Sequence, residues 1–351
     1  MINKILSLIT HDVGIDLGTA NTLILVRGKG IVIRQPSVVA RSKKDKRILA
    51  IGDEAKKMLG KTPDTIETIK PLRGGVIADF DATEAMLRHW VKQIHAGGSW
   101  FPKIPRPRIV VGIPSGVTEV ERRAVQAAAL SAGAREAFLI EEPMASAIGA
   151  KIPVLDPTGH FIVDIGGGTT EIAVLSLGGI VINKSIRTAG EDMTNAIVSF
   201  ARSKYGLIIG ETTAEDVKLQ IGSALPEIKE KTDLVHVARG RDMETGLPKS
   251  IKFTSSEIRE ALSQVVNQLV FAISEAIEET PPELVSDLLK HGLTMTGGGS
   301  QLKGLTKLVA DAIKMPVWLA DHPEETVVRG CGIVLEDESL LKRVKVVGGL
   351  R

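Results

Sequence analysis

Hydrophobic positions follow two different periods along this chain of 351 residues. Short apolar or β-branched runs such as RIVVGIP, FIVDIGG and TEIAVLSL predict strands. Longer segments such as DATEAMLRHWVKQI and TEVERRAVQAAALSAGA place apolar residues three and four positions apart, which predicts amphipathic helices. The second of these is expected to end at Gly133. Because strands and helices alternate after an opening hairpin, the pattern indicates an α/β fold.

One short sequence pattern occurs twice along the chain. GIDLGTANTLILV and VDIGGGTTEIAVL align when Asp16 is superposed on Asp164, which also pairs Gly18 with Gly166. In both copies an apolar strand, and not a helix, follows the glycines, so each copy reads as a hairpin turn whose backbone N–H groups form an anion-binding concavity. A side chain at Gly166, Gly167 or Gly168 would keep a phosphate from these amides. The length and the repeat favour two lobes, and the absence of a low-complexity linker favours a cleft between them.

Composition narrows the classes of function. Hydrophobic residues make up 43% of the chain and charged residues 25%, and no run reaches the roughly 18 to 20 apolar residues that span a bilayer. The 44 basic and 42 acidic residues are interspersed, which disfavours a nucleic-acid groove. A single cysteine, Cys331, leaves no internal disulfide or cysteine-cluster metal site, and the seven histidines lack zinc-binding spacing.

Asp16 and Asp164 each end a strand beside a glycine turn. Two carboxylates next to a polyphosphate suit Mg²⁺, a hard cation that keeps several of its waters, although each aspartate alone would also serve to cap its turn. A third glycine run, TGGGSQLKGL, precedes a helical pattern, and a helix N-terminus there would receive an α-phosphate or a ribose. The residues therefore predict a nucleotide and magnesium site.

DLGTANT, EEPMASAIG, DIGGGTT and MTGGGSQL stand in the order and rough spacing of the nucleotide site of the actin, Hsp70 and sugar-kinase superfamily. Within it, IPSGVTEVERRAV, LIEEPMASAIGA and ETPPELVSDL resemble the MreB family of bacterial actin homologues, and the resemblance extends from Asp12 to Leu335. It implies an α/β, actin-like ATPase fold. Two duplicated ribonuclease-H-like lobes would enclose a central nucleotide cleft, and each would carry a smaller inserted subdomain.

The resemblance divides the chain into four subdomains. In the usual nomenclature they are IA (1–32, 70–150 and 322–351), IB (33–69), IIA (151–186 and 252–321) and IIB (187–251).

It also implies roles for individual residues. The first phosphate loop would be Gly18, Thr19, Ala20 and Asn21, the second would be Gly166, Gly167, Gly168 and Thr169, and the nucleoside would lie on Gly297, Gly298, Gly299 and Ser300. Glu215 and Lys218 match positions that border the adenosine, although Thr212 and Glu215 also fit a helix capping box. Glu142 matches the residue that orients the attacking water, with Thr169 assisting. Its neighbour Glu141 is the alternative, and alignment on Pro143 favours Glu142. The cofactors are expected to be ATP and Mg²⁺, the latter held by Asp16 and Asp164 through water.

The segment GGSWFPKIPRPR places Trp100 and Phe101 in a glycine- and proline-rich loop followed by three basic residues. Adjacent rings backed by cations are typical of a tip that inserts into an anionic membrane, and the matching loop of the family contacts the membrane. The alternative is that both rings fold back onto the preceding helix. Residues 1–9 read equally well as a small amphipathic helix or as an ordinary first element.

The family implies a slow, filament-forming ATPase that organises cell-wall synthesis and maintains rod shape. Its expected partners are further copies of itself in paired protofilaments, the inner face of the cytoplasmic membrane, and membrane proteins of the elongation machinery, with no nucleic acid. The expected location is the cytoplasm, peripheral to that membrane. The alternatives are a small-molecule kinase, which would need an acceptor pocket, and an Hsp70-like ATPase, which would need a substrate domain after the nucleotide fold.

Overall fold

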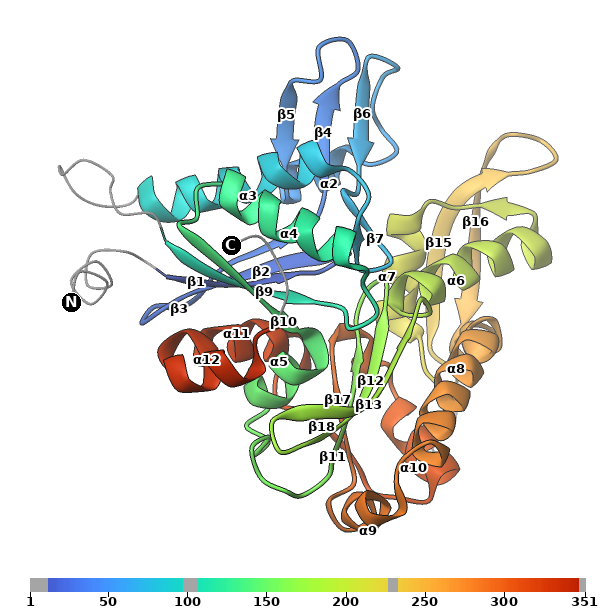
Figure 1. The fold of residues 1–351 in the computed structure, drawn as a ribbon. Helices are drawn as coiled ribbons and strands as arrows, with labels where there is room; N and C mark the ends of the chain where they lie inside the picture. The colour runs from blue at the N-terminus through green and yellow to red at the C-terminus, as the bar shows by residue number, and fades with distance from the viewer. Residues whose placement is uncertain (1–11, 97–106, 227–232, 347–351) are drawn as a thin grey trace.

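The computed structural model describes residues 12–96, 107–226 and 233–346 (Figure 1). Two five-stranded sheets form the centres of two lobes. The first sheet has the order β10-β9-β1-β2-β3 and the second the order β13-β12-β11-β17-β18. The strands of the first are β1 (Val13–Leu17), β2 (Asn21–Val26), β3 (Gly30–Pro36), β9 (Arg108–Ile113) and β10 (Glu136–Glu141); those of the second are β11 (His160–Ile165), β12 (Thr170–Ser176), β13 (Gly179–Ile186), β17 (Leu293–Thr296) and β18 (Val317–Leu319).

Both sheets share one topology. Three antiparallel strands joined by hairpins are followed by two strands that run parallel to the first. The duplication predicted from the repeated hairpin is therefore confirmed at the level of the whole sheet.

Helices cover the sheets in layers. Helices α3 (Phe80–Ala96) and α4 (Glu119–Ser131) share a core with the outer face of the first sheet, and Trp90 of the predicted amphipathic helix is buried in that core. Helices α5 (Glu142–Gly149) and α11 (Thr326–Glu336) lie between the two sheets (Figure 1). The outer face of the second sheet packs against α6 (Gly190–Tyr205), α8 (Ser255–Glu278), α9 (Pro282–His291) and α10 (Leu305–Ile313). The last helix is α12 (Glu338–Val344).

The layer between the sheets depends on glycine at the crossing of α5 and α11. A Cβ at Gly330 would overlap the Ala145 carbonyl, and one at Gly149 would overlap the Thr326 carbonyl. Only glycines let the two helix backbones approach this closely. The crossing holds these two helices together in the layer that packs against both sheets.

Each lobe carries a smaller part. The first comprises the sheet β5-β4-β6 with α2 (Asp53–Met58), and the second comprises α6, α7 (Glu211–Ile221) and the sheet β14-β15-β16. The remaining strands are β4 (Val39–Ser42), β5 (Ile48–Ile51), β6 (Ile66–Ile69), β7 (Leu72–Arg73), β8 (Val76–Ile77), β14 (Leu207–Ile208), β15 (Val235–Asp242) and β16 (Pro248–Thr254). The predicted start of the first inserted subdomain, residue 33, falls within β3, which pairs with β2 in the main sheet. The other subdomain boundaries stay predictions.

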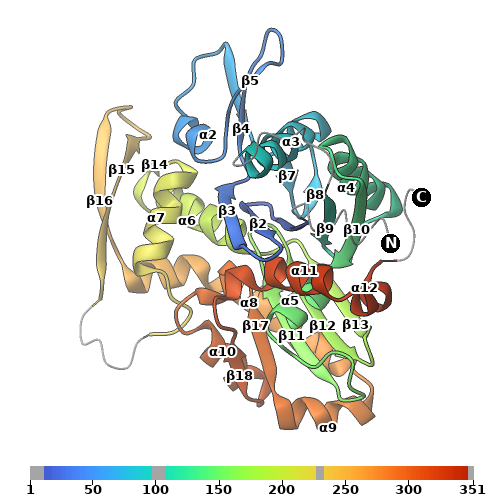
Figure 2. The ribbon, with the colours of Figure 1, turned by 90° about the vertical axis from the view of Figure 1, so that its left-hand side faces the viewer.

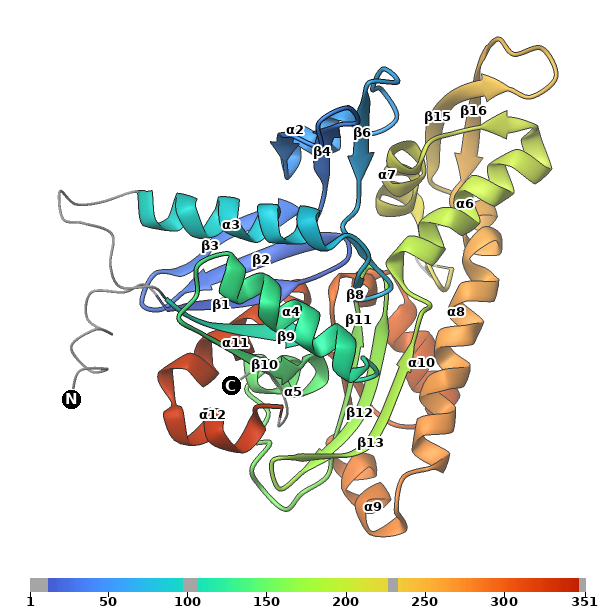
Figure 3. The same ribbon diagram turned by 45° about the horizontal axis from the view of Figure 1, so that its top comes forward.

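The two smaller parts lie at the same end of the molecule and face each other (Figures 1 and 3). Lys70, which follows β6, connects them, because its ammonium group pairs with Glu191 of α6 and with Glu211 of α7, each at 2.8 Å. These ion pairs cross from one lobe to the other.

Among the described helices, none combines the length and hydrophobicity that crossing a membrane requires.

Candidate functional site

The two repeated hairpin turns meet each other across the lobes. Gly18 to Ala20 joins β1 to β2, which begins at Asn21, and Gly166 to Thr169 joins β11 to β12. A Cβ at Gly167 would lie 2.7 Å from the Cβ of Ala20, and one at Gly168 would lie 2.6 Å from Oγ1 of Thr19. We expected these glycines to leave room for a phosphate. At Gly167 and Gly168 the structure shows another reason for glycine, because atoms of the opposite turn occupy the space that a side chain would need.

Hydrogen bonds within the second turn narrow the set of amides that an anion could contact. The N–H of Gly166 donates to the carbonyl of Thr169 at 2.9 Å, which closes the turn. The carbonyls of Gly166 and Gly167 accept from the first amides of α6, at 3.1 and 2.8 Å. Helix α6 therefore begins directly on the turn, and the amide of Gly166 is already engaged within the protein.

Asp16 and Asp164 share one region of negative charge below the turns. Burial, and next the charge of Asp164, raises the pKa of Asp16 to about 8. Burial raises the pKa of Asp164 to about 6, and hydrogen bonds from Ser146 and Thr296 partly oppose that rise. The hydroxyl of Ser146, on α5, donates directly to the Asp164 carboxylate. The two aspartates of the repeat thus lie in one electrostatic environment and not in separate pockets.

Glu142 belongs to the same cluster. It is the first residue of α5, and burial followed by the charges of Glu171, Asp16 and Asp164 raises its pKa well above the usual value. Burial also raises the pKa of Glu141, but the charge of Arg122 acts on that residue in the opposite direction. Glu142 therefore faces the aspartates, whereas Glu141 has a cationic neighbour. This difference agrees with the choice of Glu142 from the position of Pro143, and its catalytic role stays a prediction.

The carboxylate cluster fits a magnesium ion held through water. Carboxylates whose pKa values are raised by burial and by one another lack compensating positive charge, and a hard divalent cation supplies it. A metal ion held directly by the protein needs at least three ligand atoms close together. Over the described ranges, such a group is formed by His322, Glu324 and Glu325. Asp16 and Asp164 do not form such a set with a third residue, so a magnesium ion here would keep several of its waters.

The third glycine run packs against the second turn. Gly297 has a φ of +80°, and a Cβ there would overlap the Ile165 carbonyl and the Asp164 carboxylate. A Cβ at Gly299 would lie 2.5 Å from the Ile165 side chain. Only glycine lets this run lie against the end of β11.

The helix expected directly after this run is displaced. Gly298–Gln301 forms one 3₁₀ turn, η1, and α10 begins only at Leu305. The hydroxyl of Ser300, which is 1% exposed, donates to the carbonyl of Thr296 and so points into the protein. A nucleoside here would meet the backbone of η1 and not the N-terminus of an α-helix.

Glu215 and Lys218 lie on α7 and contact the start of α6. The ammonium group of Lys218 donates to the Gly190 carbonyl at 2.8 Å and pairs with Glu215 at 2.6 Å. The predicted capping box at Thr212 is wrong, because α7 begins two residues earlier than that pattern requires, with Gly210 as its N-cap and no side-chain cap. The Glu215 carboxylate instead accepts from Thr194 of α6. The pair is therefore tied to the helix that begins on the second turn.

Sequence reasoning missed two residues that line this region. Gly75, in the turn between β7 and β8, donates its N–H to Oγ1 of Thr19 at 3.1 Å. A Cβ at Gly75 would lie 2.6 Å from Pro114 and 2.9 Å from Thr169. Glu171 is the second missed residue, and its acidic side chain within the apolar run TEIAVLS was the available signal. Trp100, Phe101 and residues 1–9 lie outside the described residues.

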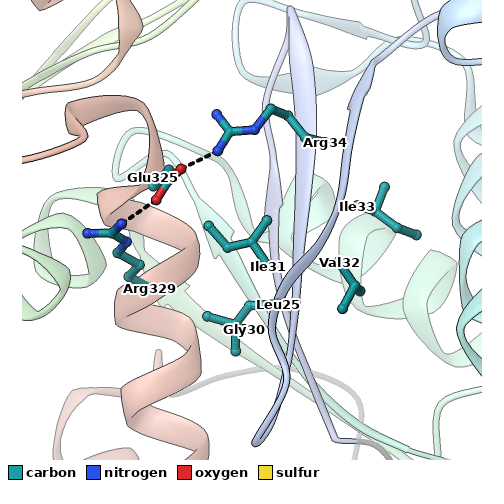
Figure 4. A pocket seen from close by; sticks show the side chains of 8 residues that line it. All are labelled: Leu25, Gly30, Ile31, Val32, Ile33, Arg34, Glu325 and Arg329. Carbon is teal, nitrogen blue, oxygen red and sulfur yellow. Dashed lines mark hydrogen bonds and ion pairs between the residues drawn. The ribbon is translucent and has the colours of Figure 1, made fainter.

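Strand β3 and helix α11 lie close together (Figure 2), and a cavity of about 440 Å³ lies between them (Figure 4). Its lining residues are Leu25, Gly30, Ile31, Val32, Ile33, Arg34, Glu325 and Arg329. Glu325 lies between two guanidinium groups and pairs with both Arg34 and Arg329. These ion pairs occupy one of the three possible metal ligands named above, and they tie β3 to α11. None of the predicted site residues lines this cavity.

The carboxylate cluster predicts how stability depends on pH in nucleotide-free, magnesium-free protein. The native state holds more protons than the unfolded chain between the ordinary pKa values near 4 and the raised values of about 6 for Asp164 and 8 for Asp16. Stability must therefore fall as the pH rises through that window. We expect the melting temperature to be lower at about pH 8.5 than at about pH 6, by about 2 °C or more. In the D16N variant this difference should shrink, and an equal difference in both proteins would contradict the assignment.

Two sheets of one topology that meet through their glycine turns define the class, since this is the architecture of an actin-like protein. The family model described as MreB/Mbl protein matches residues 10–343. The chain therefore belongs to the MreB/Mbl family. It is 47% identical over 342 residues to the cell shape-determining protein MreB of Escherichia coli K12, covering 96% of each protein. It is 43% identical over 336 residues to the cell shape-determining protein Mbl of Bacillus subtilis, covering 96% of this chain and 99% of Mbl.

Solved structures agree with this assignment. MreB5 of Spiroplasma citri bound to ADP has a TM-score of 0.86 and 37% identity, over 92% of this chain and 95% of that one. A MamK double helical filament has a TM-score of 0.76 at 22% identity, over 93% and 98% of the two chains, and supports the fold alone. The predicted fold class and the resemblance to the MreB family are thus confirmed.

Proposed function

We propose that this chain binds Mg·ATP between its two lobes, hydrolyses it slowly, and assembles into actin-like filaments on the inner face of the cytoplasmic membrane. The filaments would organise cell-wall synthesis and maintain rod shape, together with membrane proteins of the elongation machinery. The observation that carries the proposal is the meeting of the two glycine turns above a carboxylate cluster shared by Asp16, Asp164 and Glu142. The relatives named as cell shape-determining proteins, and the structures of Spiroplasma citri MreB5 with ADP and with AMPPNP, support it.

Each residue then has a defined task in hydrolysis. The two turns would hold the phosphates from opposite lobes, and Asp16 and Asp164 would hold the magnesium ion through its waters. When bound, the ion would neutralise charge that develops on the phosphates. Glu142, assisted by Thr169, would orient a water and accept its proton. The start of α6, fixed by Lys218, would keep the second turn in place.

The exposed apolar residues of the second lobe favour head-to-tail assembly. Leu289 of α9 and Trp318 of β18 are 56% and 58% exposed at one end. Met243 and Leu247, at the tip of the β15–β16 hairpin, are 47% and 64% exposed at the opposite end (Figure 1). Different surfaces at opposite ends give a heterologous contact, which extends into a filament when the rotation between subunits does not close a ring.

MreB/Mbl membership also disfavours the kinase and chaperone alternatives.

Negative-stain electron microscopy tests the proposal as a whole. The purified protein, incubated with ATP and Mg²⁺ on a lipid monolayer, should form filaments, in pairs of protofilaments, that depend on the nucleotide. A sample without ATP is the control. Absence of polymers across nucleotide, salt and lipid conditions would contradict the cytoskeletal function.

Membrane attachment is expected to depend on Trp100 and Phe101, which lie outside the described residues. Burying two rings of roughly 150 to 250 Å² each, at about 25 cal/mol per Å², stabilises one attachment by at most several kcal/mol. Because a filament repeats the loop, many weak attachments would add to firm binding. Replacing both residues by alanine should reduce co-flotation of filaments with anionic liposomes by about tenfold or more while sedimentation of polymer stays unchanged. Undiminished flotation would mean that the rings do not contact lipid.

A further inference from the structure

Glu171 is an acidic residue in a strand that is buried along its whole length. All seven residues of β12 are buried, and the residue itself is 1% exposed. Burial raises its pKa to about 7, against hydrogen bonds from Ser185 and Ser115 that lower it. A charge in such a position destabilises a strand compared with a well-packed apolar residue. Its presence therefore requires a reason other than packing.

The internal duplication of the chain shows that the hairpin itself does not need this carboxylate. The residue 148 positions before Glu171 is Leu23, just as Asp16 lies 148 positions before Asp164. The strand registers agree, because Asp164 pairs with Glu171 in the second hairpin and Asp16 pairs with Leu23 in the first. Leu23 is 4% exposed, so both positions are buried. The same structural position thus takes leucine in one lobe and glutamate in the other.

The contacts of Glu171 cross between the lobes. The backbone N–H of Ser115, which follows β9 in the first lobe, donates to its carboxylate at 3.1 Å. The hydroxyl of Ser185, on β13 of the second lobe, donates to the other oxygen at 2.7 Å. Close packing accompanies these bonds, since a Cβ at Gly116 would lie 3.1 Å from the Ser185 side chain. Glu171 therefore fastens the 114–116 loop of the first lobe onto the sheet of the second.

That loop borders the residues expected to carry out hydrolysis. Pro114 and Thr169 both pack against Gly75, whose amide contacts Thr19 of the first turn. Among the charges that act on Glu142, that of Glu171 is the strongest. A change at Glu171 thus reaches both the second turn and the start of α5.

We propose that Glu171 is a positioning residue for ATP hydrolysis, which holds the 114–116 loop across the lobes and so places Thr169 and Glu142 for attack by water. This inference rests on the proposed ATPase function. It predicts that nucleotide binding and the hydrolytic step separate when Glu171 is replaced. The carboxylate would be kept for the reaction, at the expense of stability.

The sharpest test is E171L, which installs the residue that the first lobe carries at the equivalent place. We expect a melting temperature equal to or above that of the wild type, because a buried charge is removed. ATP affinity, measured with a fluorescent ATP analogue and Mg²⁺, should stay within about threefold, whereas single-turnover hydrolysis of bound ATP should fall about tenfold or more. E171Q keeps one accepting oxygen, so its single-turnover hydrolysis should fall less than that of E171L. S185A, which leaves the Ser115 bond intact, should lose least.

Three results would overturn the inference. Wild-type hydrolysis by E171L would show that the carboxylate does not act in the reaction. An E171L protein that is unfolded, or that loses melting temperature, affinity and hydrolysis together, would show that Glu171 has a purely structural role, and E171Q would then show the same joint loss. A wild-type protein that binds ATP and never hydrolyses it would refute the proposed ATPase itself, and with it this inference.

Discussion

Replacing Glu142 by alanine is expected to slow ATP hydrolysis by about 100-fold or more, in the range that a general base contributes. The residue is the first of α5, and the charges of Glu171, Asp16 and Asp164 raise its pKa in addition to burial. Under the proposed function, its side chain would activate a water aimed at the terminal phosphate. ATP affinity should stay within about threefold or increase, because the change removes a negative charge near the phosphates. Phosphate release under single-turnover conditions measures the first quantity and equilibrium titration the second.

E141A is the matched control for this prediction. Glu141 is the adjacent carboxylate, and burial raises its pKa too, but Arg122 is its cationic neighbour. Most of the hydrolytic activity should remain in E141A. Unchanged turnover in E142A, or an equal loss in both variants, would remove Glu142 from the mechanism.

The second large effect is expected on assembly. Replacing both Leu289 and Trp318 by aspartate places two charges in the apolar surface at one end of the second lobe. A desolvated apolar or aromatic contact at the centre of an interface contributes about 2 kcal/mol or more, so the critical concentration for polymerisation should rise roughly 30-fold or more. Sedimentation of the polymer over a range of protein concentrations measures this. ATP binding by the monomer should not change, since neither residue belongs to the proposed nucleotide site.

F271D supplies a control of the same kind. Phe271 is 64% exposed on α8, the long helix that runs along the flank of the lobe (Figure 1). A charge there should leave the critical concentration within about threefold of the wild type if assembly is longitudinal. Equal effects of the two changes would argue against the assignment of the ends.

The fold could be predicted from the sequence because its main signal is repeated. Asp16 and Asp164 with their glycine turns mark two copies of one hairpin, and the following strands and helices have clear periods. The physical consequence is two five-stranded sheets with corresponding strand orders. The predicted boundary at residue 33 falls within β3, which ends at Pro36, whereas β4 begins at Val39 in another sheet, and the division into subdomains stays a prediction.

The site was less predictable, since it depends on contacts between distant segments. That Gly167 meets Ala20 is a property of how the lobes pack, and no local pattern contains it. The capping box at Thr212 failed because α7 begins at Glu211 with Gly210 as its N-cap, and the Glu215 carboxylate accepts from Thr194 of another helix. Glu171 could have been noticed, since an acidic residue in a buried strand is itself a signal, but its partner Ser115 lies 56 positions away.

In the proposed function, both lobes hold one magnesium-bound nucleotide through Asp16 and Asp164. Calorimetric titration of ATP into the wild-type protein and into D16N, each with Mg²⁺ and with EDTA, tests it most directly. We expect one ATP per wild-type chain, an affinity that falls about tenfold or more in EDTA, and a magnesium dependence that is largely lost in D16N. Equal affinities in all four titrations would mean that the two aspartates do not share a magnesium ion, and the account would be wrong.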